Sequence, residues 1–286
     1  MKKDVGTFLQ SVGKLPSLPS IYYELNRAVE NPSSSVSSIG EVIQQDQSLT
    51  SRLLRLANSA LYSFPSKIGT IEEALQLIGL REVQDLALAT CVIGAFPKLP
   101  AHLVDVFSFW RHSIGCAIAS SLLAKEQHDP APERFFVGGL LHDIGRLILF
   151  LKAPDESRQI LSTCETQAEL ASKIELEVMG FDHAILGGEL ISLWKLPISL
   201  REMVRYHHNP SRSQIALDDV SIIHHADFIT SALDFGPHGE PFVAPLLPPA
   251  DSNRCILEDH RVEGLVSELD QKCALIFPIL TQGDHD

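Results

Sequence analysis

The sequence predicts an all-α fold: a helical bundle preceded by an N-terminal helical subdomain. Apolar residues recur at helical spacing through most of the 286 residues. The strict alternation of apolar and polar residues that is typical of half-buried strands is nearly absent. Two proline-containing breaks, at residues 96–103 and 235–253, divide the helical pattern into groups.

The N-terminal half contains three well-marked helical stretches. Residues 39–63, IGEVIQQDQSLTSRLLRLANSALYS, have an apolar side that we expect to face a core, formed by Leu49, Leu53, Leu54, Leu56 and Ala57. The next helix should begin with a capping box in which Thr70 is the N-cap and Glu73 stands three residues later. Gly79 is suited to end that helix, and residues 81–96 predict a further buried helix.

The two breaks define the expected domain organisation. FPKLPAHL, residues 96–103, should end the first helical group, whereas residues 235–253 should form a long loop before a closing amphipathic helix at 261–280. We therefore expect three parts: an N-terminal helical leader at 1–100, a helical core at 101–234, and a loop with the closing helix at 235–286.

Composition excludes several function classes. The net charge of −13 argues against general nucleic-acid binding and against an anionic membrane surface, since both need a positive face. The five cysteines are odd in number, widely spaced and free of any CxxC motif, which argues against a disulfide framework and a zinc ribbon. The first twenty residues lack the apolar core of a signal peptide, and no apolar run would span a bilayer. We expect a cytoplasmic protein without a membrane partner.

Five short passages place imidazole or carboxylate groups beside apolar helical sequence. They are SFWRHSIGCAIAS, LLHDIGRLIL, GFDHAILGGELISLWKLP, VRYHHNP and IIHHADFIT. Imidazole and carboxylate together form the ligand set of Zn, Fe or Mn sites in proteins. Any single histidine among them is more often a surface residue or a hydrogen-bonded core residue. The neighbours His224 and His225 are expected to include one that faces solvent.

The pair His142-Asp143 lies in the apolar stretch LLHDIGRLIL, which is suited to a buried helix. Burying such a pair costs free energy unless other groups satisfy it. Adjacent residues on a helix point about 100° apart. His142 could therefore bind one metal ion while the carboxylate of Asp143 bridges two. Taken alone, Asp143 could equally be a helix cap or a salt-bridge partner.

Together, these passages resemble the HD phosphohydrolase superfamily, and within it the HDOD (HD-related output domain) proteins. The N-terminal stretches LPSLPSIYYELN, IQQDQSLTSRLLRLANSALYS and IGTIEEALQLIGLREVQDLAL resemble the HDOD helical leader. The resemblance runs from about Leu15 to Thr230, which is most of the chain. It implies an HD-domain helical bundle, with an HD-type metal-binding core at 101–234.

The resemblance also implies a set of metal ligands. The superfamily signature is a leading histidine, an HD pair and a trailing aspartate, to which two-metal members add further histidines. Matched position by position, the ligands are His112, His142, Asp143, His183, His207, His208 and Asp227. Asp143 would bridge two ions, and His208 would be a ligand or would hold a phosphate oxygen. Two divalent ions are implied, with Fe or Mn favoured and Zn or Ni as alternatives.

Two functions follow from the resemblance and remain open. One is a metal-dependent phosphohydrolase, acting on a phosphomonoester, phosphodiester or nucleotide, in which Asp143, His208 and Arg146 contribute to catalysis. The other is a non-catalytic regulatory scaffold with structural metal, whose partners are signalling proteins. The chain departs from the related HD-GYP phosphodiesterases: HHNPSRSQIAL lacks their glutamate and GYP stretch, and Arg146 replaces their usual lysine. Arg146 could reach a phosphate, or it could be a surface or salt-bridged arginine.

Overall fold

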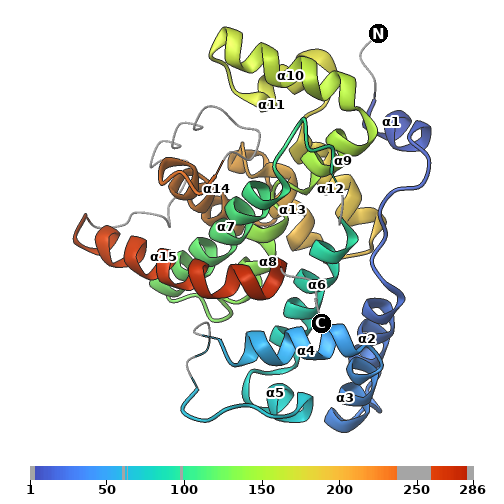
Figure 1. The fold of residues 1–286 in the computed structure, drawn as a ribbon, viewed down its shortest axis with the longest axis vertical. Helices are drawn as coiled ribbons and strands as arrows, with labels where there is room; N and C mark the ends of the chain where they lie inside the picture. The colour runs from blue at the N-terminus through green and yellow to red at the C-terminus, as the bar shows by residue number, and fades with distance from the viewer. Residues whose placement is uncertain (1–3, 60–61, 63, 97–98, 237–258, 282–286) are drawn as a thin grey trace. The chain divides into compact units, whose positions relative to one another are not determined.

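The computed structural model describes residues 4–59, 62, 64–96, 99–236 and 259–281. The described residues form helices and connecting segments and contain no strand, so the all-α prediction is confirmed. The chain divides into two compact units (Figure 1). The larger unit comprises Met1–Leu15 and Lys98–Leu269, and the smaller unit comprises Pro16–Pro97 and Asp270–Asp286.

The larger unit is built around a long central helix. Its helices are α1 (Val5–Ser11), α7 (Val106–Glu126), α8 (Arg134–Leu141), α9 (Ile144–Lys152), α10 (Pro154–Gln167), α11 (Ala171–Val178), α12 (His183–Leu193), α13 (Ile198–Tyr206), the 3-10 helix η1 (Pro210–Arg212) and α14 (Leu217–Ala232). Helix α7 packs against α8 and α14, and α12 packs against α9 and α13. Because α7 is buried on nearly all sides, its sequence is apolar around most of its circumference.

The stretch LLHDIGRLIL forms two helices rather than the single helix expected. Helix α8 ends at Leu141, α9 begins at Ile144, and the chain turns at His142 and Asp143. Asp143 has φ −97° and ψ 9°, outside the regular helical range. Both helices are buried, so the apolar pattern continues through the turn and does not reveal it. The turn places the two polar side chains at the junction of two helices.

Glycine allows α9 to approach α12 closely near this turn. A Cβ atom built on Gly145 would lie 2.0 Å from the carbonyl oxygen of His183 and 2.8 Å from the backbone nitrogen of Gly187. No side chain larger than hydrogen fits this contact unless the two backbones move apart. Gly145 therefore sets the distance between the segment that carries Asp143 and the helix that begins with His183.

The smaller unit contains α2 (Ser20–Glu30), α3 (Val36–Gln44), α4 (Gln47–Ala57), α5 (Ile71–Leu77), α6 (Leu80–Ala95) and the second part of α15 (Asp259–Thr281). The capping box of Thr70 and Glu73 is confirmed. Gly79 follows α5 with φ +101°, a backbone conformation that favours glycine. The predicted helical stretch at 39–63 is divided, because the side chain of Asp46 accepts a hydrogen bond from the backbone of Leu49 and starts α4.

The predicted apolar side of this stretch is largely buried. Leu49, Leu53, Leu56 and Ala57 are buried, whereas Leu54 is half-buried. The end of α4 is tied to the segment before α5 by Asn58. Its side-chain amide donates to the carbonyl oxygen of Ile68 at 2.9 Å, and its side-chain oxygen accepts from the Ile68 backbone nitrogen at 2.8 Å.

The remaining expectations concern the ends of helical groups. Helix α6 ends at Ala95, immediately before the proline-containing break, as predicted. The closing helix is confirmed as α15. The predicted loop at 235–253 lies outside the described residues beyond position 236. Within the part of the chain that the structure describes, no helix combines the length and apolar character needed to cross a membrane.

Candidate metal centre

Three predicted ligands from separate helices of the larger unit form one group. His112 lies on α7, His142 follows the last residue of α8, and Asp227 lies on α14. One carboxylate oxygen of Asp227 lies 3.2 Å from Nε2 of His112 and 3.6 Å from Nε2 of His142. The candidate ligand atoms all lie within 4.8 Å of one another, which suits them to share one metal ion.

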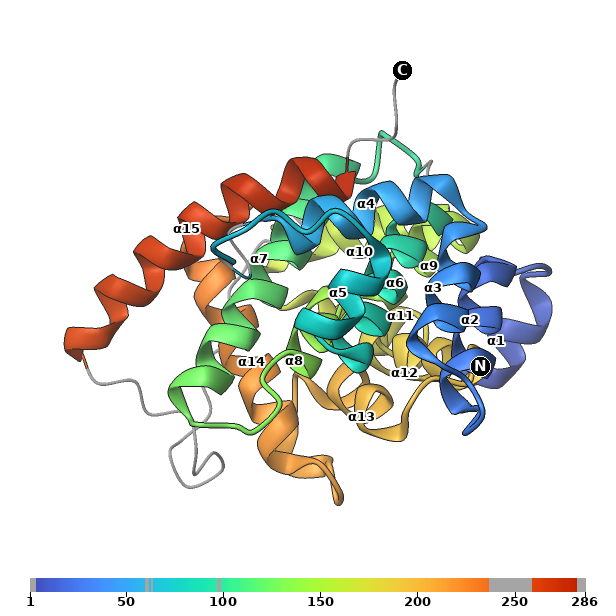
Figure 2. The same ribbon diagram turned by 90° about the horizontal axis from the view of Figure 1, so that it is seen from below.

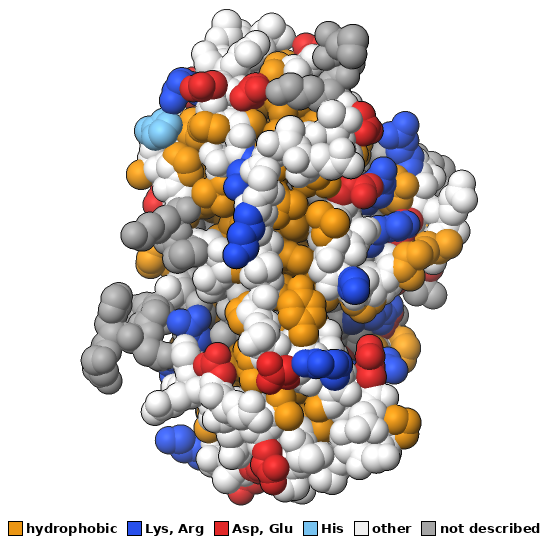
Figure 3. Space-filling model, turned by 90° about the vertical axis from the view of Figure 1, so that its right-hand side faces the viewer, with side chains coloured by type: hydrophobic (Ala, Val, Ile, Leu, Met, Phe, Trp, Pro, Cys, Tyr) orange, Lys and Arg blue, Asp and Glu red, His pale blue; other side chains and the backbone are white. Residues whose placement is uncertain are grey.

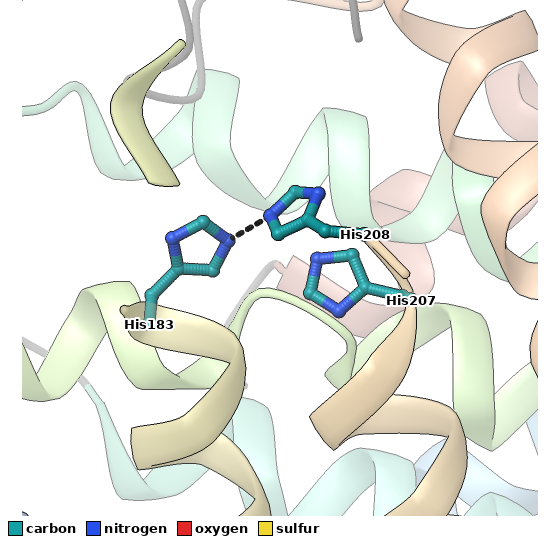
Figure 4. Close-up of side chains that lie close together, drawn as sticks. All are labelled: His183, His207 and His208. Carbon is teal, nitrogen blue, oxygen red and sulfur yellow. Dashed lines mark hydrogen bonds between the residues drawn. The ribbon is translucent and has the colours of Figure 1, made fainter. Parts of the chain in front are cut away.

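Three further histidines form a second group (Figure 4). His183 is the first residue of α12, and His207 and His208 follow the end of α13. Nε2 of His183 lies 2.8 Å from Nε2 of His208. The rings of His207 and His208 are also close, with centroids 4.0 Å apart. Figure 4 shows the three rings converging from two helices onto one position.

Asp143 lies between the two groups. One of its carboxylate oxygens is 3.0 Å from Nε2 of His183 and 3.7 Å from Nε2 of His207. The other is 3.7 Å from Nε2 of His142. The two oxygens therefore face different groups, which is the arrangement needed for a carboxylate that bridges two ions. The structure thus brings together all seven residues predicted as metal ligands.

Hydrogen bonds to the far side of two rings leave Nε2 as the atom that faces the centre. Nδ1 of His142 donates to the carbonyl oxygen of Gly139 at 2.7 Å, and Nδ1 of His207 donates to that of Val204 at 2.8 Å. Carbonyl oxygens only accept, so these Nδ1 atoms carry the hydrogen. Nε2 of His142 and of His207 are buried and make no hydrogen bond. Buried nitrogen atoms of this kind fit a metal ion.

Arg146 is buried and directed at the bridging carboxylate. It is 2% exposed, and its Nε lies 3.1 Å from the second oxygen of Asp143. Its Nη2 lies 3.5 Å from Nε2 of His183. Of the alternatives that the sequence left open for Arg146, this geometry matches the salt-bridged arginine.

Two residues outside the predicted ligand set support the centre. Glu175 on α11 is 3% exposed, and one of its oxygens accepts from both Nδ1 of His183 at 2.6 Å and the backbone nitrogen of His183 at 2.7 Å. Nδ1 of His224 donates to the carbonyl oxygen of His207 at 2.7 Å. The expectation that His224 or His225 faces solvent is wrong, since both are buried on α14. One feature of the sequence could have indicated Glu175: it is an acidic residue at a position that faces the buried side of an amphipathic helix.

The electrostatics of the centre favour a bound cation. Burial raises the pKa of Asp143, but the positive charges of Arg146, His142 and His183 together outweigh burial and hold this pKa well below its usual value. Burial and Arg146 oppose protonation of His183, yet Glu175 and Asp143 raise its pKa to about 10. Burial and positive neighbours lower the pKa of His207 to about 3, so this ring is neutral. The carboxylates thus demand positive charge. Raised pKa values of His142 and His183 show that protons on these rings meet this demand here, as a metal ion would in their place, while His207 offers a neutral imidazole.

Replacing Glu175 by glutamine tests whether its hydrogen bonds to His183 support metal binding. The amide keeps the size of the side chain but removes the charge that orients His183. We expect the affinity for metal to fall by about 10–100-fold, as for other outer partners of metal-bound histidines. Metal titration of the two proteins measures this change. Replacement of the exposed Glu30 on α2 by glutamine is the matched control, and equal affinities of all three proteins would contradict the role of Glu175.

Comparisons of sequence identify relatives of this chain. The model of the HDOD domain family matches residues 15–210, which is more than half of the chain. A curated protein of Treponema pallidum (strain Nichols), described as uncharacterized, is 30% identical over 202 residues. That match covers 69% of this chain and 38% of the relative, so the chain spans little more than a third of the relative's length.

Comparisons of structure find the same fold in proteins of two bacteria. A protein of Shewanella amazonensis SB2B, described as a candidate phosphohydrolase, is 28% identical with a TM-score of 0.75, and the match covers 96% of this chain and 98% of the other. An HDOD domain protein of Geobacter sulfurreducens, described as having unknown function, is 24% identical with a TM-score of 0.75 and coverage of 99% and 97%. The second likeness concerns the fold alone.

Proposed function

The chain belongs to the HDOD domain family, and from this premise we propose that it is a signalling protein whose two-ion metal centre hydrolyses a phosphoester. The observation that carries the proposal is the position of Asp143, with one oxygen toward His183 and the other toward His142. The Shewanella protein described as a candidate phosphohydrolase adds support, because it shares 28% of its sequence over nearly the whole chain.

The donor set is suited to two divalent ions. His112, His142 and Asp227 would hold one ion, and His183, His207 and His208 would hold the other, with Asp143 shared. Mixed imidazole and carboxylate donors favour Fe or Mn, with Zn or Ni as alternatives. Such a pair of ions, when bound, supplies a nucleophilic water of lowered pKa and stabilises charge on a phosphoryl oxygen.

The chain's own residues position and neutralise the centre. Glu175 and the carbonyl oxygens of Gly139 and Val204 fix the orientation of three imidazole rings. Arg146 pairs with Asp143 and so keeps this carboxylate ionised. His208 is half-buried, whereas the other histidines of the centre are fully buried. A phosphoester would therefore approach beside His208, which could hydrogen-bond to one of its oxygens.

The second candidate function is a regulatory scaffold in which the metal only joins helices. Its supporting observation is burial: His112, His142, His183 and His207 are all 0% exposed. They come from helices α7, α8, α12 and α13, so a shared metal centre would crosslink most of the larger unit. Under this function the protein would act through a signalling partner.

Surface charge bears on the choice of partners. On the face shown in Figure 3, acidic and basic side chains are interspersed with hydrophobic ones. Together with the net charge of −13, this argues against nucleic acid in general as the partner, and we propose a small phosphorylated molecule or a signalling protein instead.

Hydrolysis distinguishes the two functions. We expect the protein, reconstituted with Mn²⁺ or Fe²⁺, to turn over p-nitrophenyl phosphate, bis(p-nitrophenyl) phosphate or a member of a nucleotide panel. Turnover should be lost in a His207→Ala variant, because the second group then lacks a donor. A His102→Ala variant is the control, since His102 is exposed and bonds to Arg158 outside the centre. Full metal loading without turnover of any of these substrates would favour the scaffold.

A further inference from the structure

The smaller unit contains a cavity that the metal centre does not use. Its volume is about 610 Å³, within the range of about 300–1,000 Å³ that is typical of small-molecule sites. The lining residues come from α4, from the segment between α4 and α5, and from the second part of α15. Figure 2 shows the C-terminal end of α15 beside α4.

The polar part of the cavity wall carries positive charge. Arg55 and Lys67 line it, together with Ser51, Asn58 and Ser59. The described residues that line the cavity include no aspartate or glutamate, although acidic residues outnumber basic ones by 36 to 23 in the chain. Two cations and several small hydrogen-bond donors in one wall suit this part of the cavity to an anionic group.

The apolar part of the wall comes from both helices and from the segment before α5. It is formed by Leu54, Ile68, Leu275 and Ile279. Leu275 is 53% exposed, so its side chain is open to contact with a ligand. The wall therefore offers contact to an apolar body as well as to an anionic head.

The backbone next to the cations is held in place. Asn58 binds both the backbone nitrogen and the carbonyl oxygen of Ile68, which fixes the residue that follows Lys67 relative to the end of α4. Asn58 also donates to the carbonyl oxygen of Leu54 at 2.7 Å. One side chain thus holds the backbone next to Lys67 against the end of α4, which carries Arg55, before any ligand arrives.

We propose that this cavity binds a small organic anion that carries an apolar body, such as an alkyl or aryl carboxylate or phosphate. The cations Arg55 and Lys67 would contact the anionic head, and Leu275 with Ile279 would contact the body. This site is independent of hydrolysis at the metal centre. An HDOD protein with both would combine a ligand site in the smaller unit with the metal centre in the larger one.

A pair of fluorescent probes tests the proposal on the full chain. 8-Anilinonaphthalene-1-sulfonate has an aromatic body and an anionic head, whereas N-phenyl-1-naphthylamine has the same rings without the charge. We expect saturable binding of one anionic probe per chain. An Arg55→Met, Lys67→Met double variant should weaken it by about tenfold and leave the neutral probe unaffected.

The matched control is an Arg27→Met, Arg81→Met double variant, which removes the same charge from exposed positions of the smaller unit that do not line the cavity. It should bind both probes like the unmodified protein. A Leu275→Glu variant should lose the anionic probe, and the exposure of this position makes the change compatible with folding.

Competition with the anionic probe shows which anionic head group the cavity prefers. Octanoate or octyl phosphate should displace the anionic probe, and the stronger competitor indicates whether the site prefers a carboxylate or a phosphate. Inorganic phosphate should not displace it, because it lacks an apolar body. No saturable binding, or equal weakening in both double variants, would overturn the proposal.

Discussion

Replacing Asp143 by alanine should release metal from both groups of ligands and destabilise the fold. The carboxylate is the one candidate ligand that faces both groups, and it is also the ion-pair partner of the buried Arg146. Removing one partner of a buried ion pair costs about 3–5 kcal/mol, because the other charge remains unpaired. Elemental analysis measures the loss of metal, and chemical denaturation in the presence of a chelator measures the loss of stability separately.

The control for this change is Asp155→Ala. Asp155 also pairs with an arginine three residues along the chain, Arg158, but its side chain is 89% exposed. Exposed pairs of this kind contribute little, so the control should keep both its metal and its stability. An Asp143→Ala protein that retained a full metal complement would show that the carboxylate is not a shared ligand.

Replacing Gly145 by alanine should have the second large effect. The added methyl group would meet the backbone of α12 at His183 and Gly187, which cannot rotate away as a side chain could. Overpacking of a core usually costs about 1–3 kcal/mol, and contact with backbone places this variant at or above the upper end of that range. Because the clash is with the residue that supplies a ligand, metal binding by the second group should weaken as well.

Gly94→Ala is the matched control for this variant. Gly94 lies on helix α6, and a Cβ atom built there would meet nothing within 4 Å. Alanine favours a helix over glycine by about 1 kcal/mol, so the control should be neutral or slightly stabilised. Thermal unfolding of the two variants gives the comparison. Equal unfolding temperatures would show that the contact between α9 and α12 is not tight.

Much of this fold could be predicted from local patterns in the sequence. The capping box of Thr70 and Glu73, the stop at Gly79 and the end of α6 before the first proline break all depend on residues close in the chain. The prediction failed at His142-Asp143 because both adjoining helices are buried on all sides. Apolar periodicity then carries no information about where one helix ends and the next begins.

The candidate site shows the same division between local and long-range information. The resemblance to HDOD proteins singled out the seven candidate ligands, and the structure brings them together from six helices and their ends. Glu175 could not be found in this way, because its contact with His183 depends on the packing of α11 against α12. The sequence also left open which group Arg146 contacts, because this contact depends on the turn that places the carboxylate of Asp143 beside it.

The number of metal ions bound per chain tests the central claim most directly. Elemental analysis of the reconstituted protein should find two ions, and one ion each in His112→Ala and His207→Ala variants, because each variant removes a donor from one group only. Fewer than two ions in the unmodified protein, or two ions retained in either variant, would contradict a centre in which Asp143 bridges two metal sites.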